Sequence, residues 1–162
     1  MLVIDASVLA TALADDGDDG DIARVRLRGH GLAAPELIDL EVVSVLRRQF
    51  SVGKLDRRRA RLSLDDLLDL PVQRAPHRAM LRRCWELRDN LSVYDAAYVA
   101  LAEILDTPLI TADARLAKAP GIKCAVEVLS ARSAPGCGTP SSTALATAAS
   151  TPSIKTPHRR RS

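Results

Sequence analysis

Short apolar runs alternate with longer segments of helical periodicity over the first 130 residues of the chain. Runs of strand length stand at residues 2–4, 32–34, 72–74, 108–110 and within 122–128. Apolar positions at helical spacing predict helices over residues 7–14, 21–28, 35–50, 56–70, 77–89, 92–103 and 112–118. This alternation is typical of a parallel sheet with helices on both faces, so we expect an α/β fold.

Proline, glycine and acidic residues set several expected boundaries. Pro35 is expected to open the third helix and Gly53 to follow its end, because proline fits the first helical turn and glycine the residue after the last. The stretch 15–21 holds five acids and two glycines. We expect it to be a loop in which Asp21 caps the second helix.

The end of the chain differs in composition from the rest. Residues 133–162 are rich in Ser, Thr, Ala, Pro and Gly, and their net charge of +4 leaves residues 1–132 with a net charge of −1. Such a segment has too few large apolar side chains to offset the entropy of ordering it. We therefore expect one domain over residues 1–132 and a disordered tail, and any nucleic-acid affinity of the domain must come from local patches.

The segment 91–103 is expected to place a carboxylate in the first turn of a helix. Ser92 can cap the backbone N–H of Asp95, and an acid three residues after the cap gives a capping-box pattern. Leu91, Tyr98 and Val99 flank Asp95 at helical spacing, so we expect this acid beside an apolar stripe, where a carboxylate needs a partner. A simple capping role that complements the helix dipole is the alternative.

Glu41 is the second acid at an unusual position. Leu37, Ile38 and Val45 share its helix face, and acids among core residues are rare unless they are paired or bind a metal. An arginine partner is the structural alternative for Glu41. Glu36 and Asp39, on the same helix, are expected to be solvated.

Asp5 and Asp113 each follow a predicted strand closely. Both are therefore expected along the carboxyl edge of the sheet, where ligands bind in open α/β folds. Four acids could meet there only with a compensating cation, and no lysine or arginine lies within three residues of Asp5, Glu41 or Asp95. An all-oxygen cluster suits Mg²⁺ or Mn²⁺, which activate water and stabilise a scissile phosphodiester. These residues indicate a possible metal site and suggest hydrolysis.

Four segments resemble, in order, those of PIN-domain nucleases of the VapC type, the toxins of bacterial type II toxin–antitoxin pairs. They are residues 3–7 (VIDAS), 35–48 (PEL…EVVSVLRR), 92–98 (SVYDAAY) and 109–113 (LITAD), and the resemblance covers roughly residues 1–130. It implies a three-layer α/β/α sandwich around a mostly parallel sheet, and a homodimer. It also implies Mg²⁺- or Mn²⁺-dependent endoribonuclease activity on RNA, and a small antitoxin that blocks the pocket.

The resemblance also implies roles for individual residues. The catalytic acids would be Asp5, Glu41, Asp95 and Asp113. The metal ligands among them would be Asp5, Asp95 and Asp113. The hydroxyl positions that support the site correspond to Ser7 and Thr111. A non-catalytic PIN-like module that binds RNA or protein, and a metal-dependent DNA nuclease, are the alternative functions.

The densest basic run spans residues 47–61 and is opposed only by Asp56. A solvated helix face is the default interpretation of such a run. Under the nuclease hypothesis, five of its arginines are candidates for contact with the RNA backbone: Arg47, Arg48, Arg57, Arg58 and Arg59. Trp85 and Tyr98 are expected to pack, and stacking of a base on either ring is the alternative.

The remaining signals concern the location of the protein. No apolar run reaches the roughly 18 residues of a membrane span, and the start of the chain lacks the basic region of a signal peptide. The three cysteines, Cys84, Cys124 and Cys137, lack metal-site or disulfide-framework spacing. We expect a cytoplasmic protein with no membrane contact and no disulfides.

Overall fold

The chain builds one five-stranded parallel sheet in the order β3-β2-β1-β4-β5. The strands are β1 (Leu2–Ile4), β2 (Leu32–Pro35), β3 (Val72–Ala75), β4 (Leu109–Thr111) and β5 (Val126–Val128). The structure is a computed structural model, and it describes residues 1–129. The predicted tail over residues 133–162, with Cys137, lies outside the described residues.

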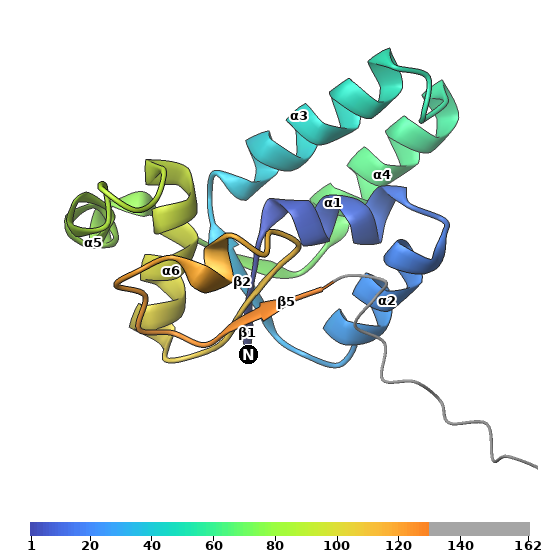
Figure 1. Ribbon diagram of the computed structural model, residues 1–162. Helices are drawn as coiled ribbons and strands as arrows, with labels where there is room; N and C mark the ends of the chain where they lie inside the picture. The colour runs from blue at the N-terminus through green and yellow to red at the C-terminus, as the bar shows by residue number, and fades with distance from the viewer. Residues whose placement is uncertain (130–162) are drawn as a thin grey trace, which may run out of the picture.

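Helices form a layer on each face of this sheet. They are α1 (Ala6–Ala14), α2 (Asp18–Leu27), α3 (Ile38–Ser51), α4 (Arg57–Asp69), α5 (Leu81–Glu86) and α6 (Val93–Leu105). On one face α1 packs against α2, α3 and α4, and on the other α6 contacts β1, β2 and β4 and carries α5 (Figure 1). The α3–α4 pair extends away from the sheet (Figure 1). The predicted three-layer α/β/α arrangement is confirmed.

The order of the strands reverses beside β1. The chain passes from β1 to β2 and β3 on one side, and then crosses to β4 and β5 on the other. The junction of β1 and β4 is therefore the topological switch point, at whose carboxyl edge ligands bind in open α/β sheets. Ile4 pairs with Ile110 across this junction, so the residues that follow these two strands meet at that edge.

Pro35 does not open a helix, and that prediction is wrong. It is the last residue of β2, paired with Ala75, and the next N–H, that of Glu36, donates to Ala75 O at 3.0 Å. The ladder between β2 and β1 ends earlier, at the pair Val3 and Ala33. Proline is tolerated here because neither neighbouring strand needs a hydrogen bond from the backbone nitrogen at this position. The helix α3 starts only at Ile38.

The acidic stretch before α2 is partly helical, which corrects the predicted loop. The helix begins at Asp18, and Asp18, Asp19 and Asp21 lie in its first turn. Negative charge there complements the positive end of the helix dipole. Gly20 lies so close to the Asp15 carbonyl that an added Cβ would stand 1.9 Å from the oxygen, so the turn accepts only glycine at this position.

Two predicted helices are shorter in the structure. The segment 77–89 forms a 3-10 turn over His77–Ala79 followed by α5, and the segment 112–118 forms only the 3-10 turn Leu116–Lys118. In the second case the backbone N–H of Arg115 donates to Asp113 Oδ1 at 2.8 Å. A side-chain bond of this kind competes with helix formation, and it keeps Asp113 outside a helix.

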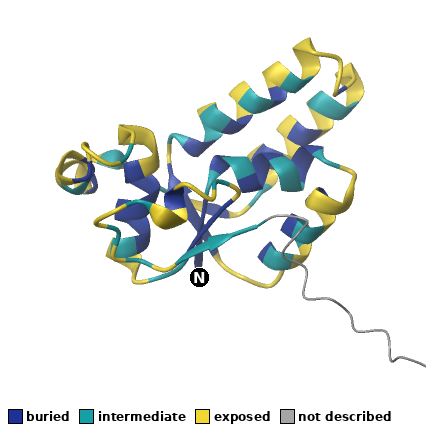
Figure 2. Cartoon of the chain, in the orientation of Figure 1, coloured by how far each residue is buried: buried dark blue, intermediate teal, exposed yellow. Residues whose placement is uncertain are grey.

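Buried residues follow the sheet and the helix faces that are turned toward it, while the far end of the α3–α4 pair is exposed (Figure 2). The core is aliphatic except for Tyr98, which is 2% exposed, as predicted. Trp85 is not in the core: it is 68% exposed on α5, so its predicted packing is wrong. Among the described residues no helix has the length and apolarity to cross a membrane, and Cys84 and Cys124 are free thiols.

Candidate active site

Asp5 lies at the carboxyl end of β1, held by two hydroxyl groups. Its Oδ2 accepts hydrogen bonds from Ser7 Oγ and Thr111 Oγ1, each at 2.7 Å. The two hydroxyls reach Asp5 from different elements: Ser7 lies in the first turn of α1, and Thr111 ends β4. Bonds of this length to an ionised oxygen are charge-assisted, so they stabilise the carboxylate without neutralising it. The structure thus brings Ser7 and Thr111 to Asp5.

Asp113 is tied to the same edge of the sheet. Its backbone N–H donates to Thr111 Oγ1 at 3.0 Å, so Thr111 bridges Asp5 and Asp113. The carboxylate also forms an ion pair with Arg115, whose Nη2 lies 2.7 Å from Oδ2. This guanidinium holds the pKa of Asp113 below its usual range.

Glu41 reaches the site from α3 and is held by a tyrosine. Tyr98 Oη donates to Glu41 Oε2 at 2.6 Å, across 57 residues of sequence. The predicted alternative, an arginine partner, is wrong, because no ion pair of Glu41 occurs within residues 1–129. Asp39, expected to be solvated, instead pairs with Arg74 at 2.8 Å.

The electrostatics of Glu41 place other acids near it. Burial raises the pKa of Glu41, the Tyr98 hydrogen bond opposes that rise, and the charges of Asp5 and Asp95 add to it. Burial and the neighbouring Glu41 also raise the pKa of Tyr98, so the phenol stays protonated and donates. The charges of Asp5, which follows β1, and of Asp95, in α6, therefore act on the Glu41 carboxylate of α3.

Asp95 occupies the first turn of α6 at the surface. Ser92 caps the helix by accepting from the Asp95 N–H at 3.1 Å, as predicted, and the Ser92 hydroxyl donates to Asp95 Oδ2 at 2.7 Å. Asp95 is exposed, so the expectation that it lies desolvated in an apolar stripe is wrong. Its charge acts on Arg115 as well as on Glu41, which connects Asp113 with the other three acids.

Three of these acids keep one oxygen without a protein partner. No donor among residues 1–129 bonds Asp5 Oδ1, Glu41 Oε1 or Asp95 Oδ1. In this part of the chain, no three Asp, Glu, His or Cys side chains are already drawn together as an ion site, in keeping with carboxylates that repel one another. Open, all-oxygen ligands of this kind suit a hard divalent cation such as Mg²⁺ or Mn²⁺ rather than zinc.

Two site residues were missed at the level of sequence. Packing or base stacking is what the sequence predicts for Tyr98, and neither includes its bond to Glu41. Its position three residues after Asp95 on one helix is the signal that its hydroxyl could face the acids. Arg115 stands two residues after Asp113, within reach of an Asx-type turn, and this spacing is the sequence signal for their contact.

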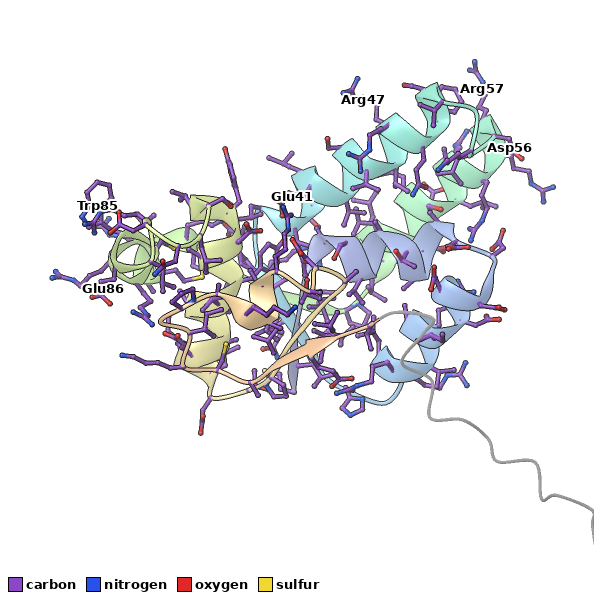
Figure 3. The ribbon with its side chains drawn as sticks, in the orientation of Figure 1. Glu41, Arg47, Asp56, Arg57, Trp85 and Glu86 are labelled. Carbon is purple, nitrogen blue, oxygen red and sulfur yellow. The ribbon has the colours of Figure 1, made fainter. Side chains whose placement is uncertain are left out.

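The basic run occupies the far end of the α3–α4 pair, where Arg47 and Arg57 point away from the body of the protein (Figure 3). Arg48 and Arg58 are exposed there too. Arg59 differs, because it bonds Asp16 on the other side of α4 at 2.8 Å. The structure therefore leaves four of the five predicted arginines open to a ligand.

The chain is similar in sequence and in fold to known proteins. The PIN domain family model matches residues 2–122. Ribonuclease VapC1 of Mycobacterium tuberculosis is 41% identical over 128 residues, which are 78% of this chain and 96% of that protein. The crystal structure of PAE2754 from Pyrobaculum aerophilum matches with a TM-score of 0.56 and 29% identity, over 78% of this chain and 83% of that one. VapBC2 from Rickettsia felis, solved with a DNA fragment from its promoter, shares the fold at a TM-score of 0.54 and 16% identity, over 78% of this chain and 97% of that one.

Proposed function

The chain belongs to the PIN-domain family and, within it, to the VapC ribonucleases, and from this premise we propose that it is a metal-dependent endoribonuclease. It acts as the toxin of a type II toxin–antitoxin pair in the cytoplasm. The observation that supports the proposal is that hydroxyl groups, and no arginine within residues 1–129, hold the carboxylates of Asp5, Glu41 and Asp95. Asp113 is joined to Asp5 through Thr111.

Each acid has a role in this proposal. Asp5, Asp95 and Asp113 are the ligands of Mg²⁺ or Mn²⁺, and Glu41 completes the acidic catalytic set. Ser7 and Thr111 orient Asp5, so that its second oxygen faces away from the hydroxyls. A hard divalent ion supplies, when bound, activation of water and charge neutralisation at the scissile phosphate.

The substrate and partners follow from the relatives. VapC1 is named a ribonuclease, and RNA is accordingly the proposed substrate, with Arg47, Arg48, Arg57 and Arg58 in contact with its backbone. A small antitoxin that covers the acidic site is the proposed partner here, as the resemblance to type II toxin–antitoxin pairs implies, and the VapBC2 structure is the neighbour that supports it. A homodimer is the proposed assembly.

The proposal is tested by incubating the purified protein with total RNA and with DNA, in Mg²⁺ and in EDTA. We expect cleavage of RNA that requires the metal. Undiminished RNA cleavage in EDTA would contradict the metal site, and cleavage of DNA in place of RNA would favour the DNA nuclease. Absence of cleavage with any metal, together with RNA binding, would favour the non-catalytic module.

Asp95→Asn provides the matched variant, because it removes a ligand charge and keeps the size of the side chain. We expect cleavage to fall by at least ~10²-fold, equivalent to several kcal/mol of lost charge stabilisation. The Asp66→Asn variant, on the exposed surface of α4, is the control and should cleave as the wild type does. An active Asp95→Asn protein would remove Asp95 from the ligand set.

A further inference from the structure

Trp85, the one tryptophan of the chain, lies on the surface with a cation on its ring. The Cζ atom of Arg88 stands 4.9 Å from the centroid of the indole. Arg88 is fixed there, because its Nη1 donates to the Trp85 carbonyl at 2.9 Å and its Nη2 lies 3.5 Å from Asp89. Exposure of 68% leaves most of this large aromatic residue open to a ligand.

The segment around Trp85 carries unopposed positive charge. Arg78 and Arg82 are exposed, and neither forms a hydrogen bond or an ion pair within residues 1–129. The acid next to Trp85, Glu86, is already paired with Arg83 at 3.0 Å. An open aromatic face beside free cations matches single-stranded nucleic acid, whose bases stack on aromatic rings while its phosphates meet the cations.

The position of Trp85 relative to the acids fits a polynucleotide. In Figure 3, Glu41 lies between Trp85 on one side and Arg47 and Arg57 on the other. The chain leads from α5 straight into α6, with the N–H of Leu91 bonded to Leu87 O at 3.0 Å. A strand that enters over the basic end of α3–α4 and crosses the acids would therefore continue toward α5.

We propose that the Trp85–Arg88 pair is a stacking platform for an unpaired base of the RNA substrate, on the side of the acids opposite the basic α3–α4 end. This proposal rests on the ribonuclease function proposed above. Stacking tolerates any base, since every base offers a π-face. The platform therefore adds affinity for single-stranded over duplex RNA and does not read a sequence.

The single tryptophan makes the platform directly observable. Full-length protein is titrated with a short single-stranded RNA in Ca²⁺, and the fluorescence of Trp85 is followed. We expect quenching on binding, and no quenching by an oligonucleotide with the same phosphates but abasic sugars. Quenching that is equal with the abasic strand, or absent while the RNA binds by anisotropy, would overturn the proposal.

Variants give the second readout. Trp85→Ala is expected to weaken RNA binding about 5- to 100-fold and to raise KM for cleavage in Mg²⁺ while kcat stays within about twofold. Trp85→Phe, which keeps a ring, should restore most of the affinity. Ile104→Ala removes another exposed apolar side chain (56%), near the C-terminal end of α6, and should change neither quantity.

The remaining outcomes also decide between the two proposals. RNA-dependent quenching in a protein that never cleaves would keep the platform and refute the ribonuclease. Cleavage with equal KM in wild type and Trp85→Ala would keep the ribonuclease and refute the platform. If Trp85→Ala sediments as a monomer while the wild type sediments as a dimer, and its RNA affinity is unchanged, this surface would be a contact between two copies of the chain.

Discussion

The change of Tyr98 to phenylalanine removes one oxygen atom from the centre of the acidic site. That oxygen donates to Glu41 Oε2 at 2.6 Å, in a residue that is 2% exposed. A hydrogen bond to a charged group contributes about 1.5–3 kcal/mol to stability, and a neutral one about 0.5–1.5 kcal/mol. At about pH 8, well above the usual glutamate range, we expect Tyr98→Phe to lower the free energy of unfolding by about 1.5–3 kcal/mol in EDTA.

The loss should depend on pH in a defined direction. Burial raises the pKa of Glu41 above its ordinary value of 4.5, and the Tyr98 hydroxyl opposes that rise. Without the hydroxyl the pKa of Glu41 rises further, so the native variant holds a proton at pH values where the unfolded chain has lost it. Its stability therefore falls more steeply than that of the wild type as pH rises from 4.5. Below that pH the loss should shrink to about 0.5–1.5 kcal/mol.

Urea unfolding followed by far-UV circular dichroism, at about pH 4, 6 and 8, measures both effects. Tyr94→Phe is the control: the only other tyrosine is 65% exposed, makes no hydrogen bond within the described residues, and should stay within about 0.5 kcal/mol of the wild type. A Tyr98→Phe protein that matches Tyr94→Phe at every pH would refute the role given to this hydrogen bond.

Three further predictions concern the acids, the basic end of α3–α4 and the tail. Glu41→Gln should be at least as stable as the wild type in EDTA at neutral pH, because it removes a carboxylate whose pKa is raised by folding. It should gain less stability from Mg²⁺ than the ~2.7 kcal/mol expected for the wild type at a hundredfold excess over Kd. Thermal melts with and without Mg²⁺ measure both effects, and clear destabilisation of the variant in EDTA would contradict the prediction. The double variant Arg57→Gln, Arg58→Gln should reduce the slope of log binding constant against log salt concentration for RNA by about one unit or less per lost phosphate contact. Metal binding, measured by calorimetry, should be unchanged. An unaltered slope would mean that these arginines are only solvated and do not contact RNA. Truncation after Arg132 should leave the melting temperature and the metal-dependent cleavage intact, and failure to fold would show that the domain extends further.

The three central strands, β1, β2 and β4, could be predicted because each is a short apolar run, and strands buried on both faces of a parallel sheet need no alternation. The edge strands β3 and β5 contain polar residues and gave a weaker signal. The helix boundaries were harder, because they depend on partners far along the chain. Pro35 stays in β2 because β3 continues beside it, and that pairing joins residues separated by 40 positions of sequence. Local propensity favours proline at a helix start and contains no information about this long-range pairing.

The places of three candidate acids in the fold could be predicted from sequence because each stands at a position fixed by an element: Asp5 after β1, Asp113 after β4 and Asp95 in the first turn of α6. The groups that hold them could not all be located. Tyr98 reaches Glu41 only because α6 and α3 approach each other in the folded chain. Asp95 lies in the first turn of α6, which is exposed, whereas the residues from Ala96 to Ala102 are buried; the spacing of apolar residues does not reveal where along a helix burial begins.

The kind of partner separates two of the candidate site acids, Asp5 and Glu41, from structural acids in the same protein, whereas Asp113 is paired with Arg115. Three half-buried acids elsewhere, Asp39, Glu103 and Glu127, each bond an arginine at 2.7–2.8 Å, which cancels their charge. Asp5 and Glu41 are comparably buried, yet hydroxyl groups hold them. A hydroxyl orients a carboxylate and leaves its negative charge in place, at a cost in stability that an arginine would have avoided. In contrast to Asp39, Glu103 and Glu127, which arginine neutralises, Asp5 and Glu41 have partners that leave their oxygens available to a cation from outside the chain.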